Sequence, residues 1–300
     1  MDFNNPKIVT VLISGGVSIV TVLLGFVLKA CFERHFLLFK LESEHRYEQK
    51  KKIKEVLARY KTQLLDAGET LNHRLWNFSG NYDEEWHGTQ KAGDFANHYY
   101  LASFVYRMLA FFAWVRQIES DMVHLDTTIA SKDDLNFVKF LRLFTQTQCD
   151  LELFKGIKYD KAYAKDHFFH NNFQHMCDRL LDGGKVISFA EFKGNKNSAR
   201  EEASPMVNFL AGMNPKESRL RWDRLQAFHF VLLMFMNCYG YDFQYTTKEK
   251  ITDLLSFQSR PNQVVNNLGT MISRIRLDQQ KEVKQVLETL NKSMVTPINA

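Results

Sequence analysis

Residues 8–28 read IVTVLISGGVSIVTVLLGFVL and contain no charged side chain. An α-helix of this length spans roughly 31 Å, which matches the hydrocarbon core of a bilayer at about 30 Å. Glycines in the stretch would weaken a soluble helix, but glycine is frequent in membrane helices. The sequence therefore predicts that residues 1–30 form a single transmembrane anchor, with the lipid bilayer as the partner of residues 8–28.

The positive charges beside this stretch predict its orientation. Lys7 stands alone before it, whereas Lys29, Arg34 and Lys40 follow it. Short flanks rich in Lys and Arg stay on the cytoplasmic side. The expected localisation is the cell (inner or plasma) membrane, single-pass, with the N-terminus outside and the bulk of the chain cytoplasmic.

Two other interpretations of this region stay open. A cleaved leader has a shorter apolar stretch of about 7–15 residues, and residues 28–31 resemble a lipoprotein box that Lys29 interrupts. Cys31 is alternatively a juxtamembrane thiol that carries an acyl chain. The four cysteines show no C-x-x-C spacing, so we expect free thiols rather than disulfides or a cysteine zinc site.

The composition limits the fold and the partners. A hydrophobic fraction of 45% and a charged fraction of 24% indicate a folded chain, and only five prolines interrupt it. The net charge of +5 is concentrated in residues 29–61, which leaves residues 62–300 neutral overall. A neutral domain has no electrostatic footprint for nucleic acid, so no nucleic-acid partner is expected.

The remaining chain has apolar residues at helical spacing and no useful stretch of alternating polar and apolar residues. The predicted fold class is all-α: a transmembrane helix, a helical stalk and a multi-helix cytoplasmic domain. Helices are expected at 53–78 with a break near Gly68, 98–125, 133–154, 160–182, 215–239, 247–258 and 261 to about 292. The expected parts are the anchor (1–30), a juxtamembrane stalk (31–66), a helical core unit (67–192), a polar linker (193–213) and a C-terminal helical unit (214–300).

Local signals mark three of the helix starts. Ser131 is placed to cap the helix that follows it. Ser188 with Glu191, and Thr246 with Glu249, have the spacing of capping boxes.

The strongly apolar helix at 98–125 has two interpretations. Residues 97–117 form either a second membrane span or a buried core helix. A central Arg107 costs about 2.5–3.5 kcal/mol on the membrane-insertion scale, which favours the core helix.

Charged and aromatic residues in and near this helix are the candidates for ligand binding: Arg74, Arg107, Trp114, Arg116 and Glu119. Arg116 and Glu119 are three residues apart and can pair on one helix face. Buried charges need partners, so one interpretation is a structural ion pair in which Arg74 also takes part. The other is a guanidinium pocket for an acidic ligand.

The weak metal candidates are His167, His170 and His175, since two imidazoles on one helix face suit a metal ion. They lack the H-E-x-x-H pattern, and a polar helix face is the simpler explanation. No metal and no cofactor are therefore predicted. Glycine-rich phosphate loops, G-x-S-x-G and kinase signatures are also absent from the sequence, which gives no positive support for an enzyme.

Two stretches, ARYKTQLLDAGETLNHRLWNF (58–78) and YLASFVYRMLAFFAWVRQIESDMVHLD (100–126), resemble a pattern found in uncharacterised bacterial membrane-anchored helical proteins. The resemblance covers about 55–195. Lys61 stands where that pattern has arginine, and Gly68 interrupts its alanine pair. The resemblance implies a recurring helical unit and transfers no activity and no site.

Two functions follow from these features. The first is a membrane-tethered helical interaction module, a sensor, adaptor or effector in stress or phage defence, which binds a protein partner or itself. The alternative is a membrane-anchored enzyme or small-ligand receptor with a pocket lined by arginine and histidine. The sequence alone names neither the partner nor the substrate.

Overall fold

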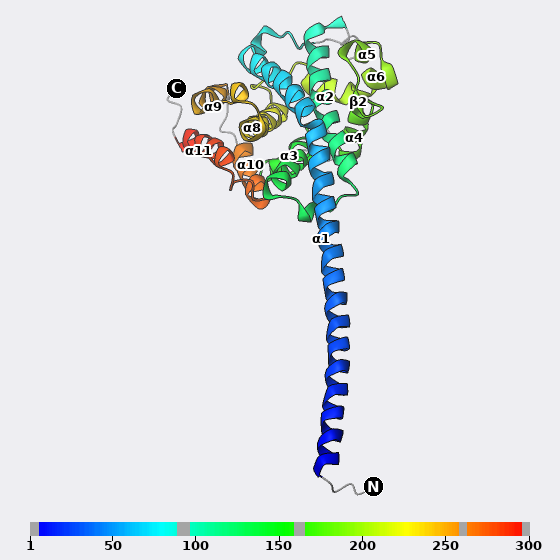
Figure 1. Cartoon of the computed structure of the whole chain (residues 1–300). Helices are drawn as coiled ribbons and strands as arrows, with labels where there is room; N and C mark the ends of the chain where they lie inside the picture. Colours follow the sequence, from blue (N-terminus) through cyan, green and yellow to red (C-terminus); the bar gives the residue numbers. More distant parts are fainter. Residues whose placement is uncertain (1–5, 89–96, 159–165, 258–262, 296–300) are drawn as a thin grey trace. The chain divides into compact units, whose positions relative to one another are not determined.

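The computed structural model describes residues 6–88, 97–158, 166–257 and 263–295, and these residues are overwhelmingly helical, as predicted (Figure 1). The chain divides into two units, Met1–Lys52 and Ile53–Ala300. The α-helices are α1 (Pro6–Gly80), α2 (Tyr99–Met122), α3 (Lys132–Cys149), α4 (His170–Asp178), α5 (Phe189–Lys193), α6 (Ala199–Glu202), α7 (Ser204–Leu210), α8 (Arg221–Tyr239), α9 (Lys248–Ser256), α10 (Gln263–Arg274) and α11 (Lys281–Val295).

Strand structure within these ranges is limited to one small hairpin. Strands β1 (Leu181–Asp182) and β2 (Lys185–Val186) pair antiparallel around Gly183 and Gly184. Both glycines have positive φ, 57° and 78°, which suits a tight turn that L-residues rarely adopt. The helix expected to end at these glycines instead ends at Asp178, and the hairpin follows it.

In the first unit the structure describes a single stretch of α1. Its apolar side chains are exposed, with Phe26 69% and Ile19 63% accessible. Among the described residues, one helix is long and apolar enough to cross a membrane, and it is α1. The hydroxyl groups of Thr10, Ser18 and Thr21 each donate to the carbonyl oxygen four residues earlier, at 2.7–2.9 Å, so no side-chain hydroxyl in this trio needs water.

Beyond the apolar stretch, α1 becomes polar, as its sequence predicts. Ion pairs one turn apart join Lys29 to Glu33, Lys40 to Glu44, and Arg46 to Glu42. Such exposed pairs contribute only about 0.3–0.5 kcal/mol each, so they support the helix without anchoring it to anything else.

In the second unit, the predicted stalk is partly core. Ile53, Leu57, Leu64 and Leu65 of α1 are buried, because their spacing places them on one face of the helix. No break occurs at Gly68. Its missing side chain lets α1 approach the core closely: a Cβ there would lie 3.2 Å from the Sδ atom of Met236, and 3.5 Å from Leu232 and Phe111.

The centre of the second unit consists of α2, α3 and α8. α3 lies along α8, and α2 packs against α4 and α7 (Figure 1). Phenylalanine rings interlock there, for example Phe111 with Phe144 at 4.9 Å and Phe112 with Phe228 at 5.2 Å between ring centroids. Edge and tilted ring pairs at such distances stabilise a core beyond their buried area.

The side chains of α2 confirm that it is a core helix of this unit. Phe104, Met108, Leu109 and Ile118 are each 0% exposed. Among the described residues, α2 does not have the properties of a membrane span; only α1 does.

Two predicted caps are confirmed and a third is wrong. The Oγ atom of Ser131 accepts the backbone N–H of Asp134, and Ser188 forms a complete capping box with Glu191. Thr246 does not cap α9. Its backbone instead forms two hydrogen bonds with the Asn237 side chain, at 2.8 and 3.0 Å, which tie it to the end of α8.

The region predicted as a linker (193–213) contains helices α6 and α7. Met206, Val207, Phe209 and Leu210 are buried, and α7 packs against α2. The polar run hid this packing, since the large apolar residues come only after residue 205 and the buried residues before it are the small Ala199 and Ala203.

Two other helix boundaries differ from the prediction. α8 begins at Arg221 rather than at 215, because Asn214 starts a turn by accepting the backbone N–H of Lys216. The final helix is divided into α10 and α11, and Arg276 between them has a positive φ of 58°. Leu277, fully buried after this turn, holds the connection against the core.

Candidate functional site

The predicted ligand-binding residues lie at three separate places. Arg116 and Glu119 face α3 and α4, and Trp114 packs on α1. Arg74 contacts Ser103 and Tyr100 in the first turns of α2, and its charge acts on Arg107 one turn further along. The periodicity of α2 separates them, because residues on one helix that are not three, four or seven apart point in different directions.

Trp114 is partly buried and packs against the core. Its ring lies 6.0 Å from that of Tyr60, whose hydroxyl group donates a 2.7 Å hydrogen bond to Asp121. These contacts join α1 to α2 and leave Trp114 no direct part in the groove described below.

Arg116 pairs with Asp178 of α4 and not with Glu119. The Nε atom of Arg116 lies 3.2 Å from Oδ1 of Asp178, a partner 62 residues away in the sequence. The pairing predicted from the three-residue spacing of Arg116 and Glu119 is therefore wrong.

Glu119 makes no hydrogen bond and no ion pair with any described residue, although it is half-buried. Burial raises the pKa of its carboxyl group, while the positive charges of Arg116, Arg142 and His170 act in the opposite direction. A carboxyl group in this position is poised to accept a hydrogen bond from a ligand or to hold a proton itself.

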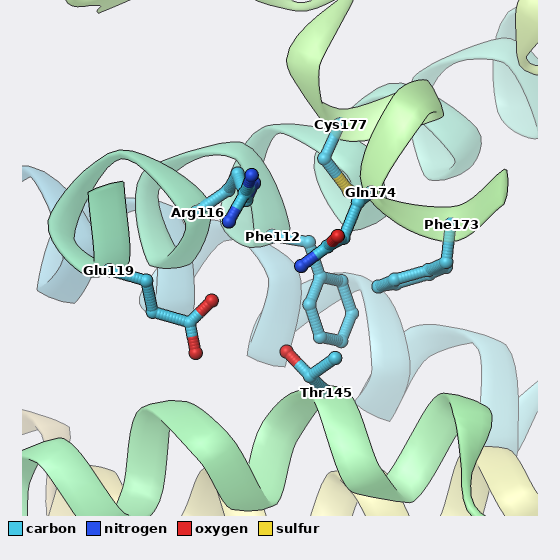
Figure 2. Close-up of a pocket in the computed structure, with 7 residues that line it drawn as sticks. All are labelled: Phe112, Arg116, Glu119, Thr145, Phe173, Gln174 and Cys177. Carbon is cyan, nitrogen blue, oxygen red and sulfur yellow. The ribbon is translucent and has the colours of Figure 1, made fainter. Parts of the chain in front are cut away.

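On one side of Glu119 is a small internal cavity (Figure 2). Phe112 and Arg116 reach it from α2, Thr145 from α3 and Gln174 from α4. Its volume of about 10 Å³ is enough for one water molecule. The Arg116 and Gln174 side chains and the Thr145 hydroxyl group supply the polar partners that such a water needs.

On the other side of Glu119 is an open groove with a volume of about 360 Å³. We call it the α2–α3–α4 groove; it is lined by Glu119, Arg142, Thr145, Gln146, Cys149, Asp150 and His170. This volume lies within the range of small-molecule sites, about 300–1,000 Å³. Glu119 and Thr145 line both the cavity and the groove, so the two spaces meet at these residues.

Two further groove residues lack partners within the described ranges: Arg142 and His170 form no hydrogen bond and no ion pair there, and both are exposed. Asp150, in contrast, is occupied, since it accepts the backbone N–H of Glu152 at 2.8 Å. The groove thus offers one carboxyl, one guanidinium and one imidazole group to a ligand.

The two thiols at this place are poor nucleophiles. Burial raises the pKa of Cys149 to about 12 and that of Cys177 well above its ordinary value. Because the thiolate is the reactive form, both side chains act here as small apolar groups.

The three predicted histidines do not converge. His167 is buried and precedes α4, and burial lowers its pKa. His170 is the first residue of α4. The Nε2 atom of His175 lies 3.6 Å from Oε2 of Glu202. In the part of the chain that the structure describes, no group of three or more His, Cys, Asp or Glu side chains is arranged to hold a metal ion.

Sequence reasoning missed Arg142 and the polar face of α3. The available signal was the polar residues Arg142, Thr145 and Gln146, spaced by three or four in a stretch of the helix (140–148) whose other residues are buried. That pattern indicates a polar helix face that is not packed into the core, but it does not show which helix lies opposite.

Arg74 and Arg107 form a separate pair. The Arg74 guanidinium group donates to Oγ of Ser103 at 2.8 Å and lies 4.2 Å from the ring centre of Tyr100. The pKa of Arg107 is lowered mainly by burial and also by the positive charge of Arg74. The predicted ion pair between Arg74 and a carboxylate is not found among the described residues.

No protein-family model, curated protein or solved structure matches this chain.

Proposed function

We propose that this protein is a membrane-tethered receptor for a small polar ligand, which binds in the α2–α3–α4 groove. The observation that carries the proposal is Glu119. A half-buried carboxyl group with a raised pKa and no protein partner among the described residues is costly to maintain, unless a ligand completes its environment.

The charges of the groove indicate the chemistry of the ligand. Glu119 accepts an N–H or O–H donor, whereas Arg142 and His170 suit an acidic or strongly polar acceptor group. Because these charges are nearly balanced, a zwitterion or a neutral molecule with several polar groups fits better than a polyanion. We therefore propose a ligand of amino-acid-like chemistry, with an amino group at Glu119 and an acidic group at Arg142.

The anchor is the second part of the proposal. We infer that α1 crosses the cell membrane with its N-terminus outside, which makes the groove-bearing unit cytoplasmic. The apolar stretch of α1 and the excess of Lys and Arg after it support this topology. Cysteine labelling from either side of sealed cells, at Cys31 and at a cysteine introduced at Asp2, tests it.

Native mass spectrometry of the full chain in detergent tests the receptor function. The wild-type protein is expected to retain a small polar molecule, or to bind one from a mixture of amino acids and related zwitterions. Glu119→Gln should lose it, because the amide has no negative charge for the amino group. Glu288→Gln on α11, an exposed glutamate outside the groove, is the matched control and should bind like the wild type.

Three results would contradict or change the receptor proposal. A ligand that binds equally to the Glu119→Gln variant places the binding site elsewhere. A wild-type protein that binds none of these molecules contradicts the receptor proposal. Conversion of the bound molecule into a product would make the protein an enzyme, with Glu119 in the role of general acid or base.

The second candidate is the interaction module, in which the protein binds itself. Tyr241, Phe243 and Tyr245 lie in one exposed turn after α8, with Phe243 75% accessible and stacked 5.5 Å from Tyr241. Exposed aromatic residues are typical anchors of protein interfaces. If this function is correct, Phe243→Asp converts a dimer of the full chain into a monomer by light scattering and leaves ligand retention unchanged.

A further inference from the structure

One face of α2 carries an arginine pair that the α2–α3–α4 groove does not use. Tyr100, Ser103 and Arg107 follow one another at intervals of three and four residues, so they share a face of the helix. Arg74, from the part of α1 that belongs to the second unit, meets this face at Ser103 and Tyr100. None of these residues lines the groove.

Arg74 is held in place by its neighbours, and no carboxylate among the described residues neutralises it. It is only 8% exposed, its terminal nitrogen donates to Oγ of Ser103 at 2.8 Å, and its guanidinium group lies over the Tyr100 ring. Its Nε atom is buried and has no hydrogen-bond partner among the residues that the structure describes. A buried N–H group without a partner costs about 1–3 kcal/mol, so this side chain is prepared for an acceptor.

No carboxylate compensates the two charges within the ranges that the structure describes. Arg107 is half-buried, and it forms neither an ion pair nor a hydrogen bond there. The effects on its pKa come from burial, from Arg74 and from the Tyr99 and Tyr100 hydroxyl groups, with no acid among them. Two like charges in a partly buried place repel each other unless an anion lies between them.

Aromatic rings lie next to Tyr100, the ring that Arg74 contacts. The ring of Trp86 meets that of Tyr100 at 5.6 Å, edge to face, and Trp86 is 47% exposed. Tyr99 is 63% exposed and contacts Phe189 through its ring. The Tyr100 ring restricts Arg74, and the exposed rings of Trp86 and Tyr99 leave apolar surface nearby.

We propose that Arg74 and Arg107 bind the phosphate group of a phosphate monoester. Guanidinium groups match the oxygens of phosphate with paired hydrogen bonds, and a dianion neutralises both arginines at once, whereas a carboxylate neutralises only one. The exposed rings of Trp86 and Tyr99 provide a surface for the remainder of the molecule. The phosphate group belongs either to a soluble metabolite or to a lipid headgroup.

Calorimetric titration of the full chain with inorganic phosphate, in phosphatidylcholine nanodiscs and at constant ionic strength, tests the site. The wild-type protein is expected to bind phosphate, and Arg107→Gln should weaken binding by about tenfold or more, since a charge-assisted bidentate contact is lost. Arg107→Lys keeps the positive charge but cannot form two parallel hydrogen bonds to the phosphate, so its phosphate affinity should lie between those of the wild type and Arg107→Gln. Lys281→Gln, at an exposed lysine of α11 outside both the groove and the arginine pair, is the control and should bind phosphate like the wild type.

The thermal midpoint provides a second readout that does not depend on the heat of binding. Without phosphate, Arg107→Gln should unfold at the wild-type temperature or above it, because one of two repelling charges is gone. With phosphate, the midpoint of the wild type should rise and that of Arg107→Gln should not. A variant that unfolds well below the wild type without phosphate would show that Arg107 is structural and would overturn the proposal.

Other results also decide against the site. Absence of phosphate binding by the wild type overturns it. Binding that survives in Arg107→Gln but disappears in Arg142→Gln places the ion in the groove. Loss of the amino-acid-like ligand in Glu119→Gln has no bearing on this site, so the two proposals fail independently.

Changing the lipid composition of the nanodiscs distinguishes a lipid headgroup from a soluble phosphate monoester. In nanodiscs that contain phosphatidic acid, a headgroup that reaches the arginine pair competes with inorganic phosphate, and the apparent affinity of the wild type falls. An unchanged affinity assigns the site to a soluble phosphate monoester. Both results keep the arginine pair as a phosphate site and name its ligand.

Discussion

The Nε atom of Arg116 lies 3.2 Å from Oδ1 of Asp178, across the contact between α2 and α4. This ion pair occupies the arginine that is nearest in sequence to Glu119 and leaves the glutamate facing the α2–α3–α4 groove. This ion pair leaves Glu119 without a partner among the described residues, and the proposed receptor function depends on that carboxyl group. Five predictions follow from this and from the surrounding packing.

The raised pKa of Glu119 gives the protein a specific pH response. In the folded state this carboxyl group holds its proton to a higher pH than in the unfolded chain, so its contribution is favourable at low pH and is lost as the pH rises through the folded pKa. Glu119→Gln, which cannot ionise, should therefore raise the thermal midpoint at neutral pH. The gain should shrink when the scan is repeated near pH 4, where the wild-type carboxyl group is protonated. A gain that does not change with pH would contradict the assignment.

The pH dependence of stability that His229 produces has the opposite direction. It is 1% exposed, and burial lowers its pKa to about 3. The unfolded chain takes up a proton near pH 6.5 while the folded chain does not, so stability is lost as the pH falls below 6.5. Between pH 6.5 and 4.5 the loss is roughly 2–3 kcal/mol. His229→Gln, which keeps a donor for Asn72, should reduce this acid sensitivity when unfolding is followed by denaturant titration at both pH values.

Arg224 is fully buried and supports three turns of backbone. It donates to the carbonyl oxygens of Asp166, Thr147 and Asp150, and its guanidinium group lies 4.4 Å from the ring centre of Phe154. Arg224→Met would leave these carbonyl groups without a donor. The expected loss in the free energy of unfolding is about 3–5 kcal/mol.

Arg142→Met is the control for this loss, because Arg142 is an exposed arginine without a partner among the described residues. It should change the free energy of unfolding by no more than about 0.5 kcal/mol. Equal effects of the two substitutions in chemical denaturation would show that Arg224 is not a support of the core.

Gly68 permits the close approach of α1 to the core. Gly68→Ala places a methyl group 3.2 Å from the flexible Met236 side chain, so its steric cost should be offset by better helix propensity, with a net change below about 1 kcal/mol. Gly68→Leu has no space and should cost about 1–3 kcal/mol or more. Gly269→Leu, at a position with open space around it, should be neutral or stabilising in the same denaturation assay.

The apolar stretch of α1 is expected to hold the protein in the membrane. Ile19→Arg places a charge in the middle of the stretch, at a cost of about 2.5–3.5 kcal/mol for insertion. The fraction of protein that stays with the membrane after an alkaline wash should fall markedly. Tyr47→Arg, in the polar part of the same helix, should leave that fraction unchanged, and an equal loss in both variants would argue against the anchor.

Several features of the fold were predictable because they are local. The apolar positions of α2, the Ser131 cap and the Ser188–Glu191 capping box involve residues within one or two helical turns. The Thr246 cap was wrong because α9 begins one residue later, with Thr247 at its N-cap position, and the Thr246 backbone N–H donates to the more distant Asn237. The region 193–213 was misleading for a similar reason: its polar beginning concealed apolar side chains that pack against α2 only in the folded chain.

For the candidate site, the residue types were predictable but their pairing was not. The sequence identified Arg116 and Glu119 as charges that need partners in an apolar helix. It paired them with each other, since the nearest opposite charge in the sequence is the natural choice. The folded chain instead places Asp178 of α4 next to Arg116, and Arg142 of α3 in the same groove as Glu119. Neither residue has a fixed position relative to α2 until the helices pack.

The sequence by itself determined that this chain is helical and that residues 8–28 form a helical stretch apolar enough for a membrane, because helix periodicity and hydropathy depend on neighbouring residues alone. Tertiary structure decided which polar side chains of the described residues have partners within the fold and which do not. An ion pair such as Arg116–Asp178 depends on where two separate helices cross, and the burial that raises the pKa of Glu119 exists only when α2, α3 and α4 enclose it. That division explains why the candidate functions rest on Glu119 and on the Arg74–Arg107 pair rather than on any sequence motif.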